Sequence, residues 1–97
     1  MPDVNQLEGF DWNKGNLDKS YQKHGTTPQE AEEAFLDPNL KVSDDPKHSQ
    51  SEKRFVALGK TFNRKILFIV FTFRNKLVRA VSARAANQKE RKRYESI

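Results

Sequence analysis

The sequence contains no cysteine among its 97 residues, and it has only one tryptophan and one methionine. The lack of cysteine excludes a disulfide framework, a cysteine-ligated zinc finger and thiol catalysis. The longest apolar run, 66–71, has six residues, against the roughly 18 that a membrane helix needs. The N-terminal MPDVNQLEGF has neither the basic nor the apolar region of a secretory signal. We therefore expect a small cytoplasmic protein without a membrane partner.

Motifs for nucleotide binding and for common hydrolases are also missing. The sequence has no GxGxxG, P-loop, HExxH or GxSxG pattern. Asp44, Asp45 and His48 could offer metal ligands, but their spacing fits no defined site, and a solvated loop is the preferred interpretation. We therefore predict no cofactor and no metal site.

Charge is distributed unevenly along the chain. Residues 1–50 carry five lysines against ten acidic residues, a net charge of −5, and no arginine. Residues 51–97 carry thirteen basic residues against three glutamates, a net charge of +10. Arginine binds phosphate with a planar fork that lysine lacks. The second half is therefore expected to face a polyanion, with nucleic acid favoured over a merely solvated basic surface.

The length favours one domain over residues 1–97, with a loose leader at 1–9. Apolar spacing predicts a first helix at 13–24 after a very short strand at 10–12. Thr27, Pro28 and Glu30 form the signature of a capping box that starts a second helix, which Asp37-Pro38 ends.

The remaining sequence alternates between strand-forming runs and turns. Strands are predicted at 40–42, 54–60, 66–73 and 77–85, with turns at 62–65 and 74–76. The run 66–73 is apolar on both faces, which indicates a central strand. Tight turns make the strands antiparallel. A short helix is expected from the Asn87 cap to Tyr94. The predicted fold class is α+β: two N-terminal helices, an antiparallel sheet of three or four strands and a C-terminal helix.

Four arginines fall on or beside these strands: Arg54, Arg74, Arg79 and Arg84. Each alone could point to solvent, but together they suggest a shared anion site. With a two-residue loop after Arg74, Arg74 and Arg79 share a face and Arg84 points away. With a three-residue loop, Arg84 replaces Arg79 on that face, and the sequence leaves the two registers open.

Three further groups are candidates for chemistry. His24 is either the C-cap of the first helix or an acid–base residue, since the histidine pKa lies near neutrality. Tyr94 either packs on the sheet or contributes to a site beside it. The closing helix carries basic side chains that either are solvated or bind phosphates; they are Lys89, Arg91, Lys92 and Arg93.

Residues over 10–95 also resemble a known family. The elements that carry the resemblance are 10–14, 23–25, Glu30-Ala31, Phe35, Asp37-Pro38, Asp44, His48-Ser49, Glu52, Arg54, Gly59, Thr72, Arg74, Arg79, 82–84, Glu90-Arg91 and Tyr94. Their order and spacing resemble the BrnT toxins of bacterial type II toxin–antitoxin systems. The resemblance implies a RelE- or barnase-like fold and metal-independent cleavage of RNA that arrests translation. It also implies a BrnA-type DNA-binding antitoxin, through which alone the complex would reach operator DNA.

A metal-free ribonuclease needs a base for the 2′-hydroxyl, cations for the phosphate and an acid for the leaving oxygen. On this reading, Arg54, Arg74, Arg79 and Arg84 hold the phosphate, and His24 or Glu52 is the base. Tyr94 or Lys23 assists as acid or by positioning. The leading alternative is a non-enzymatic nucleic-acid-binding module; a third is an interaction domain whose acidic half binds a basic partner.

Overall fold

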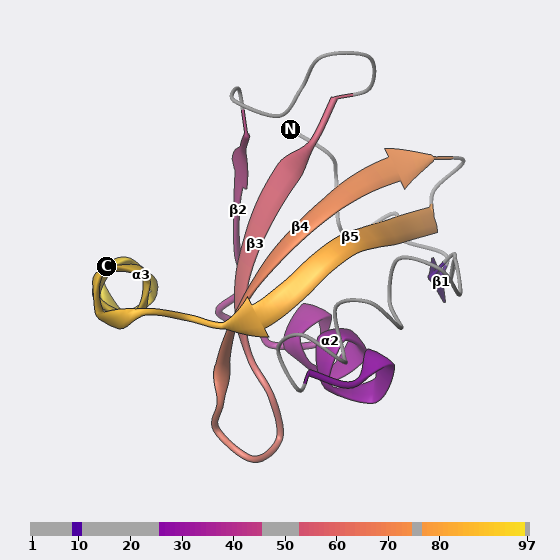
Figure 1. Ribbon diagram of the computed structural model, residues 1–97. Helices are drawn as coiled ribbons and strands as arrows, with labels where there is room; N and C mark the ends of the chain where they lie inside the picture. Colours follow the sequence, from indigo (N-terminus) through magenta and orange to yellow (C-terminus); the bar gives the residue numbers. More distant parts are fainter. Residues whose placement is uncertain (1–8, 11–25, 46–52, 75–76, 97) are drawn as a thin grey trace.

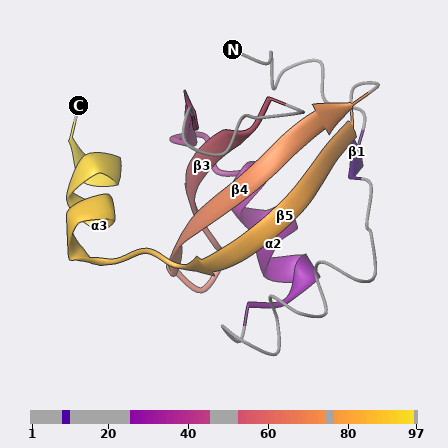
Figure 2. The ribbon, with the colours of Figure 1, turned by 45° about the horizontal axis from the view of Figure 1, so that its top comes forward.

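The computed structural model describes residues 9–10, 26–45, 53–74 and 77–96. These residues form a sheet in the order β1-β5-β4-β3-β2, with α2 against one face and α3 beside the other (Figures 1 and 2). The strands are β1 (Gly9–Phe10), β2 (Lys41–Asp44), β3 (Phe55–Lys60), β4 (Ile66–Arg74) and β5 (Leu77–Ala85), and the helices are α2 (Pro28–Phe35) and α3 (Gln88–Glu95). No helix within these ranges is long and apolar enough to cross a membrane.

The sheet confirms the predicted antiparallel meander and adds a fifth strand. β2, β3, β4 and β5 pair antiparallel in chain order, as tight turns require. β1 pairs in parallel with β5, with Gly9 opposite Leu77. Gly9, expected at the end of the leader, is therefore part of the sheet. The predicted first helix at 13–24 and the rest of the leader lie outside the described residues.

Helix α2 starts as its capping box predicts. The Thr27 hydroxyl accepts a hydrogen bond from the backbone N–H of Glu30, and the Glu30 carboxylate accepts one from the N–H of Thr27. The three apolar positions expected on its buried stripe, Ala31, Ala34 and Phe35, are all buried. Phe35 meets Phe71 of β4 edge to face, with ring centroids 5.1 Å apart, so the helix packs on the centre of the sheet.

Close packing between α2 and β3 depends on Gly59. A Cβ atom at this position would lie 2.3 Å from the carbonyl oxygen of Ala34 and 2.9 Å from its carbon. Glycine lets the backbone of the strand approach the backbone of the helix to contact distance. Because of this close approach, α2 covers the core, whose largest fully buried side chains are Phe71, Leu67, Ile69 and Val78.

Strand β4 lies at the centre of the sheet, as its apolar sequence predicts. Leu67, Ile69 and Phe71 face α2 and are buried. The prediction of two buried faces holds only in part, because Phe68 and Val70 on the other face are half-buried. On that second face Phe68 and Val70 stay partly exposed, whereas Val56, Leu58 and Thr72 are buried.

A β-bulge in β5 resolves the hairpin register in a way that neither alternative anticipated. Arg74 pairs with Leu77, and Arg79 pairs with Thr72, as the two-residue loop predicts. The register then shifts, because Val70 pairs with Ser82 while Phe71 pairs with Ala80. The extra residue, Val81, reverses the alternation of side chains. Arg84, expected to point away from Arg79, therefore lies on the same face.

Helix α3 confirms the predicted closing helix and is attached at both ends. Asn87 and Glu90 form its capping box. At the other end the Tyr94 hydroxyl donates a hydrogen bond to the carboxylate of Asp37, and the ammonium group of Lys60 lies 5.6 Å from the Tyr94 ring centroid. These contacts fix α3 beside the sheet face that α2 leaves uncovered.

Candidate nucleic-acid interface

The sheet face opposite α2 is the candidate site, and we call it the open face. The cross-strand pairing places polar and apolar side chains on it in rows. Its described members are Lys41, Ser43, Val56, Leu58, Phe68, Val70, Thr72, Arg79, Ser82 and Arg84. Cations, hydroxyls and one partly exposed aromatic ring are the groups that bind single-stranded nucleic acid.

Arg79 has an unengaged guanidinium within the described part of the chain. It is half-buried on β5, and none of the described residues forms a hydrogen bond or ion pair with it. Its cross-strand neighbour Thr72 is 2% exposed, and the Thr72 hydroxyl likewise finds no hydrogen-bond partner there. A half-buried cation without a counterion favours an anionic ligand.

Arg84 is engaged on several sides. Its Nη1 and Nη2 donate to Oε1 and Oε2 of Glu90 at 2.8 and 2.9 Å, and Nη1 also donates to the Ala85 carbonyl. The guanidinium carbon lies 4.2 Å from the ring centroid of Phe68. Hydrogen bonding to Glu90 raises the pKa of Arg84. Burial would raise the pKa of Glu90, but hydrogen bonds from Arg84 and from the N–H of Asn87 leave it below its usual value.

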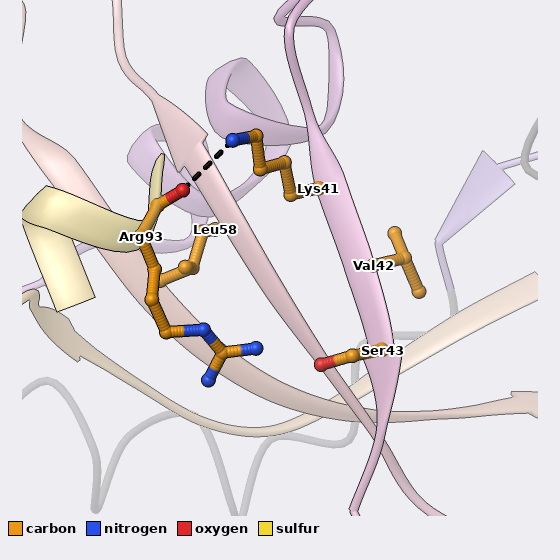
Figure 3. Close-up of a pocket in the computed structure, with 5 residues that line it drawn as sticks. All are labelled: Lys41, Val42, Ser43, Leu58 and Arg93. Carbon is orange, nitrogen blue, oxygen red and sulfur yellow. Dashed lines mark hydrogen bonds between the residues drawn. The ribbon is translucent and has the colours of Figure 1, made fainter. Parts of the chain in front are cut away.

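A groove of about 330 Å³ separates α3 from strands β2 and β3. Lys41, Val42, Ser43, Leu58 and Arg93 line it (Figure 3). The Lys41 ammonium donates to the carbonyl of Arg93 at 2.7 Å and to that of Ser96. The groove therefore has two cations at its rim, continuous with the open face.

Tyr94, predicted as a possible acid, is 7% exposed and engaged with Asp37. Burial and the hydrogen bond to Asp37 raise the pKa of Tyr94 to about 12. Burial would raise the pKa of Asp37, but hydrogen bonds from Tyr94 and from the N–H groups of Asn39 and Lys60 outweigh it and lower that pKa. The structure thus fits the alternative in which Tyr94 packs and anchors α3.

The other predicted residues are spread over several places. Arg54 is half-buried just before β3, and Arg74 ends β4. The basic residues of α3 are exposed but diverge: Arg93 lines the groove, whereas Arg91 lies with Lys60 and Arg64 near the β3–β4 turn.

His24, Lys23 and Glu52 lie outside the described residues, so the predicted base has no described position. Across the described ranges, no three His, Cys, Asp or Glu side chains gather as metal ligands.

Sequence reasoning missed three residues of this face. The apolar run of its strand places Phe68 in the core, and neither charge nor motif singles out Lys41 or Thr72 as a site residue. The signal for Phe68 and Thr72 was available, since both occupy even positions of a strand whose odd positions form the core. Lys41 could be placed only with the β2 register in hand.

Replacing Tyr94 with phenylalanine should lower the free energy of unfolding at pH 7 by about 1.5–3 kcal/mol, because a hydrogen bond to a carboxylate is lost. Because the pKa of Tyr94 is raised, the stabilisation of the fold by its hydroxyl is fully present below pH 10 and is lost between pH 10 and about 12. Because the pKa of Asp37 is lowered, the stabilisation of the fold by its carboxylate is fully present above about pH 4 and is lost in more acidic solution. Urea unfolding from pH 3 to 12 measures both effects. Equal stability of the two proteins at pH 7 would contradict this anchoring role.

Comparison with known proteins assigns a family to this fold and face. A sequence model described as "Ribonuclease toxin, BrnT, of type II toxin-antitoxin system" matches residues 12–90. The crystal structure of the Brucella abortus ribonuclease toxin BrnT superposes with a TM-score of 0.63 at 22% identity, covering 82% of this chain and 97% of that one. No curated protein sequence matches significantly. The chain therefore belongs to the BrnT family of ribonuclease toxins of type II toxin–antitoxin systems.

Proposed function

We propose that this toxin is a metal-independent endoribonuclease of RelE- or barnase-like type, which cleaves RNA on the open face and arrests translation in the cytoplasm. Its partner is a BrnA-type antitoxin, and operator DNA is reached only through their complex. Residues 1–97 act as a single toxin domain.

The Arg79 guanidinium, which has no hydrogen-bond or ion-pair partner among the described residues, is the observation that carries this proposal. Cleavage of a phosphodiester concentrates negative charge on the phosphate in the transition state, and a preorganised cation is the direct way to stabilise it. Arg79 is held half-buried on β5, where solvent screening is weaker than at the surface. The carboxylate of Glu90 is already neutralised by Arg84.

The remaining roles follow the chemistry of the reaction. Arg54 and Arg74 supply further positive charge, and His24 or Glu52 accepts the proton of the 2′-hydroxyl. The buried, high-pKa hydroxyl of Tyr94 is a poor proton donor at neutral pH, so Lys23 is the better candidate for the leaving oxygen. Lys89, Arg91, Lys92 and Arg93 provide long-range attraction for the RNA backbone.

Cleavage in excess EDTA tests metal independence. We expect the purified toxin to degrade total cellular RNA at the same rate with EDTA as with magnesium, because arginine side chains replace a metal as the source of positive charge. Intact RNA in EDTA, with cleavage restored by magnesium, would contradict metal independence. Binding without cleavage under both conditions would instead favour the nucleic-acid-binding module.

The antitoxin is proposed to cover the open face. Residues 51–97 carry a net charge of +10, which an acidic segment of an antitoxin would neutralise while blocking RNA. Expression of the toxin alone should stop growth, and co-expression of the antitoxin should restore it. Cross-linking from Ser82 on the open face should capture the antitoxin. Capture from Gln29 on α2 alone would contradict occlusion of the face.

A further inference from the structure

The contacts of Arg84 suggest a role other than the phosphate binding first predicted for it. Of its five N–H donors, both on Nη1 and one on Nη2 are used by Glu90 and the Ala85 carbonyl. The Nη1–Nη2 end of the guanidinium, one of the two edges that can hold a phosphate with two parallel bonds, is therefore occupied, which leaves the Nε–Nη2 edge.

The charge of Arg84 is also compensated. Glu90 keeps its carboxylate because its pKa is lowered, so the pair is close to neutral at pH 7. A phosphate at this position would gain little net attraction and would approach a carboxylate. A neutral aromatic ligand needs no net positive charge and is not repelled by the Glu90 carboxylate.

The flat surface of the Arg84 guanidinium also remains accessible to a ligand. One side of the guanidinium lies over Phe68 at 4.2 Å, and Glu90 fixes its orientation from the edge. The Arg84 side chain keeps 34% of its surface exposed. Unpaired nucleobases stack on guanidinium planes as they do on aromatic rings.

We propose that Arg84, held over Phe68 by Glu90, is a stacking platform for one unpaired nucleobase of the RNA. The proposal rests on the RNA-binding function proposed above. Arg79 lies five positions earlier on the same face, about 15 Å away along the strand. On the open face, Arg79 thus binds a phosphate and Arg84 stacks on a base.

Two oligonucleotides separate the two tasks: a 2′-O-methyl hexanucleotide, which cannot be cleaved through its 2′-hydroxyl, and an abasic chain of equal length. The wild type should bind the hexanucleotide about 5- to 150-fold more tightly than the abasic chain for each stacked base. Arg84→Lys should remove one such factor, because an ammonium group offers no plane. It should leave the salt dependence of abasic binding unchanged.

Arg79→Lys, Arg79→Gln and Phe68→Leu complete the design. Both Arg79 variants keep the base preference, and Arg79→Gln should also reduce the salt slope of binding by about one. Phe68→Leu removes the ring beneath the guanidinium while sparing Glu90, so it should weaken the preference even if Arg84→Lys proves unstable. Circular dichroism confirms the fold of each variant.

The outcomes separate this proposal from the one it rests on. Binding of neither oligonucleotide by the wild type would overturn RNA binding and the platform together. Equal binding of both would overturn the platform alone. A full base preference in Arg84→Lys and Phe68→Leu would also overturn it.

Discussion

Replacing Arg79 with lysine is expected to slow RNA cleavage by about 30- to 1,000-fold while RNA binding stays within a few-fold of the wild type. Guanidinium can hold two phosphate oxygens at fixed geometry, whereas an ammonium group is a point charge on a flexible chain. The substitution therefore keeps the attraction and loses most of the transition-state stabilisation, about 2–4 kcal/mol. Single-turnover cleavage and filter binding with the same RNA separate the two quantities.

Arg64→Lys is the matched control for this substitution. Arg64 is exposed in the β3–β4 turn, and it keeps a positive φ of 66° that lysine adopts at a similar cost. Its variant should cleave within about twofold of the wild type. Cleavage by Arg79→Lys at the same level would show that Arg79 supplies only diffuse attraction, and the transition-state role would be wrong.

Substituting alanine for Gly59 should destabilise the protein by about 3 kcal/mol or more, at the upper end of overpacking effects. The added methyl would lie 2.3 Å from the Ala34 carbonyl oxygen, and the obstacle is helix backbone that cannot rotate away. Helix α2 must then move outward and uncover Phe71 and its neighbours. Urea denaturation followed by circular dichroism measures the loss.

An exposed position nearby provides the comparison for Gly59→Ala. Asn63→Ala in the β3–β4 turn should change the free energy of unfolding by less than about 0.5 kcal/mol. In the absence of a clash, Gly59→Ala would stabilise a strand slightly, since alanine loses less backbone entropy on folding. A neutral or stabilising result would therefore contradict the close approach of α2 to β3.

The main elements were predictable because their signals are local. Capping boxes at Thr27 and Asn87 begin both described helices, and short turns between apolar runs dictate an antiparallel meander. The parallel pairing of β1 with β5 was not predictable, because it joins residues 68 positions apart through backbone hydrogen bonds. Two residues of β1 carry too little sequence pattern to indicate a partner.

The candidate site was predictable in composition but not in arrangement. The arginines were identified from charge and residue type, and Arg79 and Arg84 do share the open face. Their common face depends on the bulge at Val81. Glycine often marks a bulge in a sequence, but this position holds valine, so the sequence does not indicate the bulge. The double use of Glu90, as helix cap and as partner of Arg84, was also beyond sequence reasoning, because it depends on how α3 turns back toward the end of β5.

The bulge at Val81 reverses which residues of β5 face the open side of the sheet, so a one-residue deletion in this strand would alter the face. Before it, odd-numbered residues reach the open face; after it, even-numbered residues do. Deleting one codon there would keep every arginine and every charge. One end of the strand would nevertheless turn over, bringing either Arg79 or Arg84 to the side that packs against α2. In this family member, the number of residues between the two arginines therefore decides whether both lie on the proposed RNA-binding face.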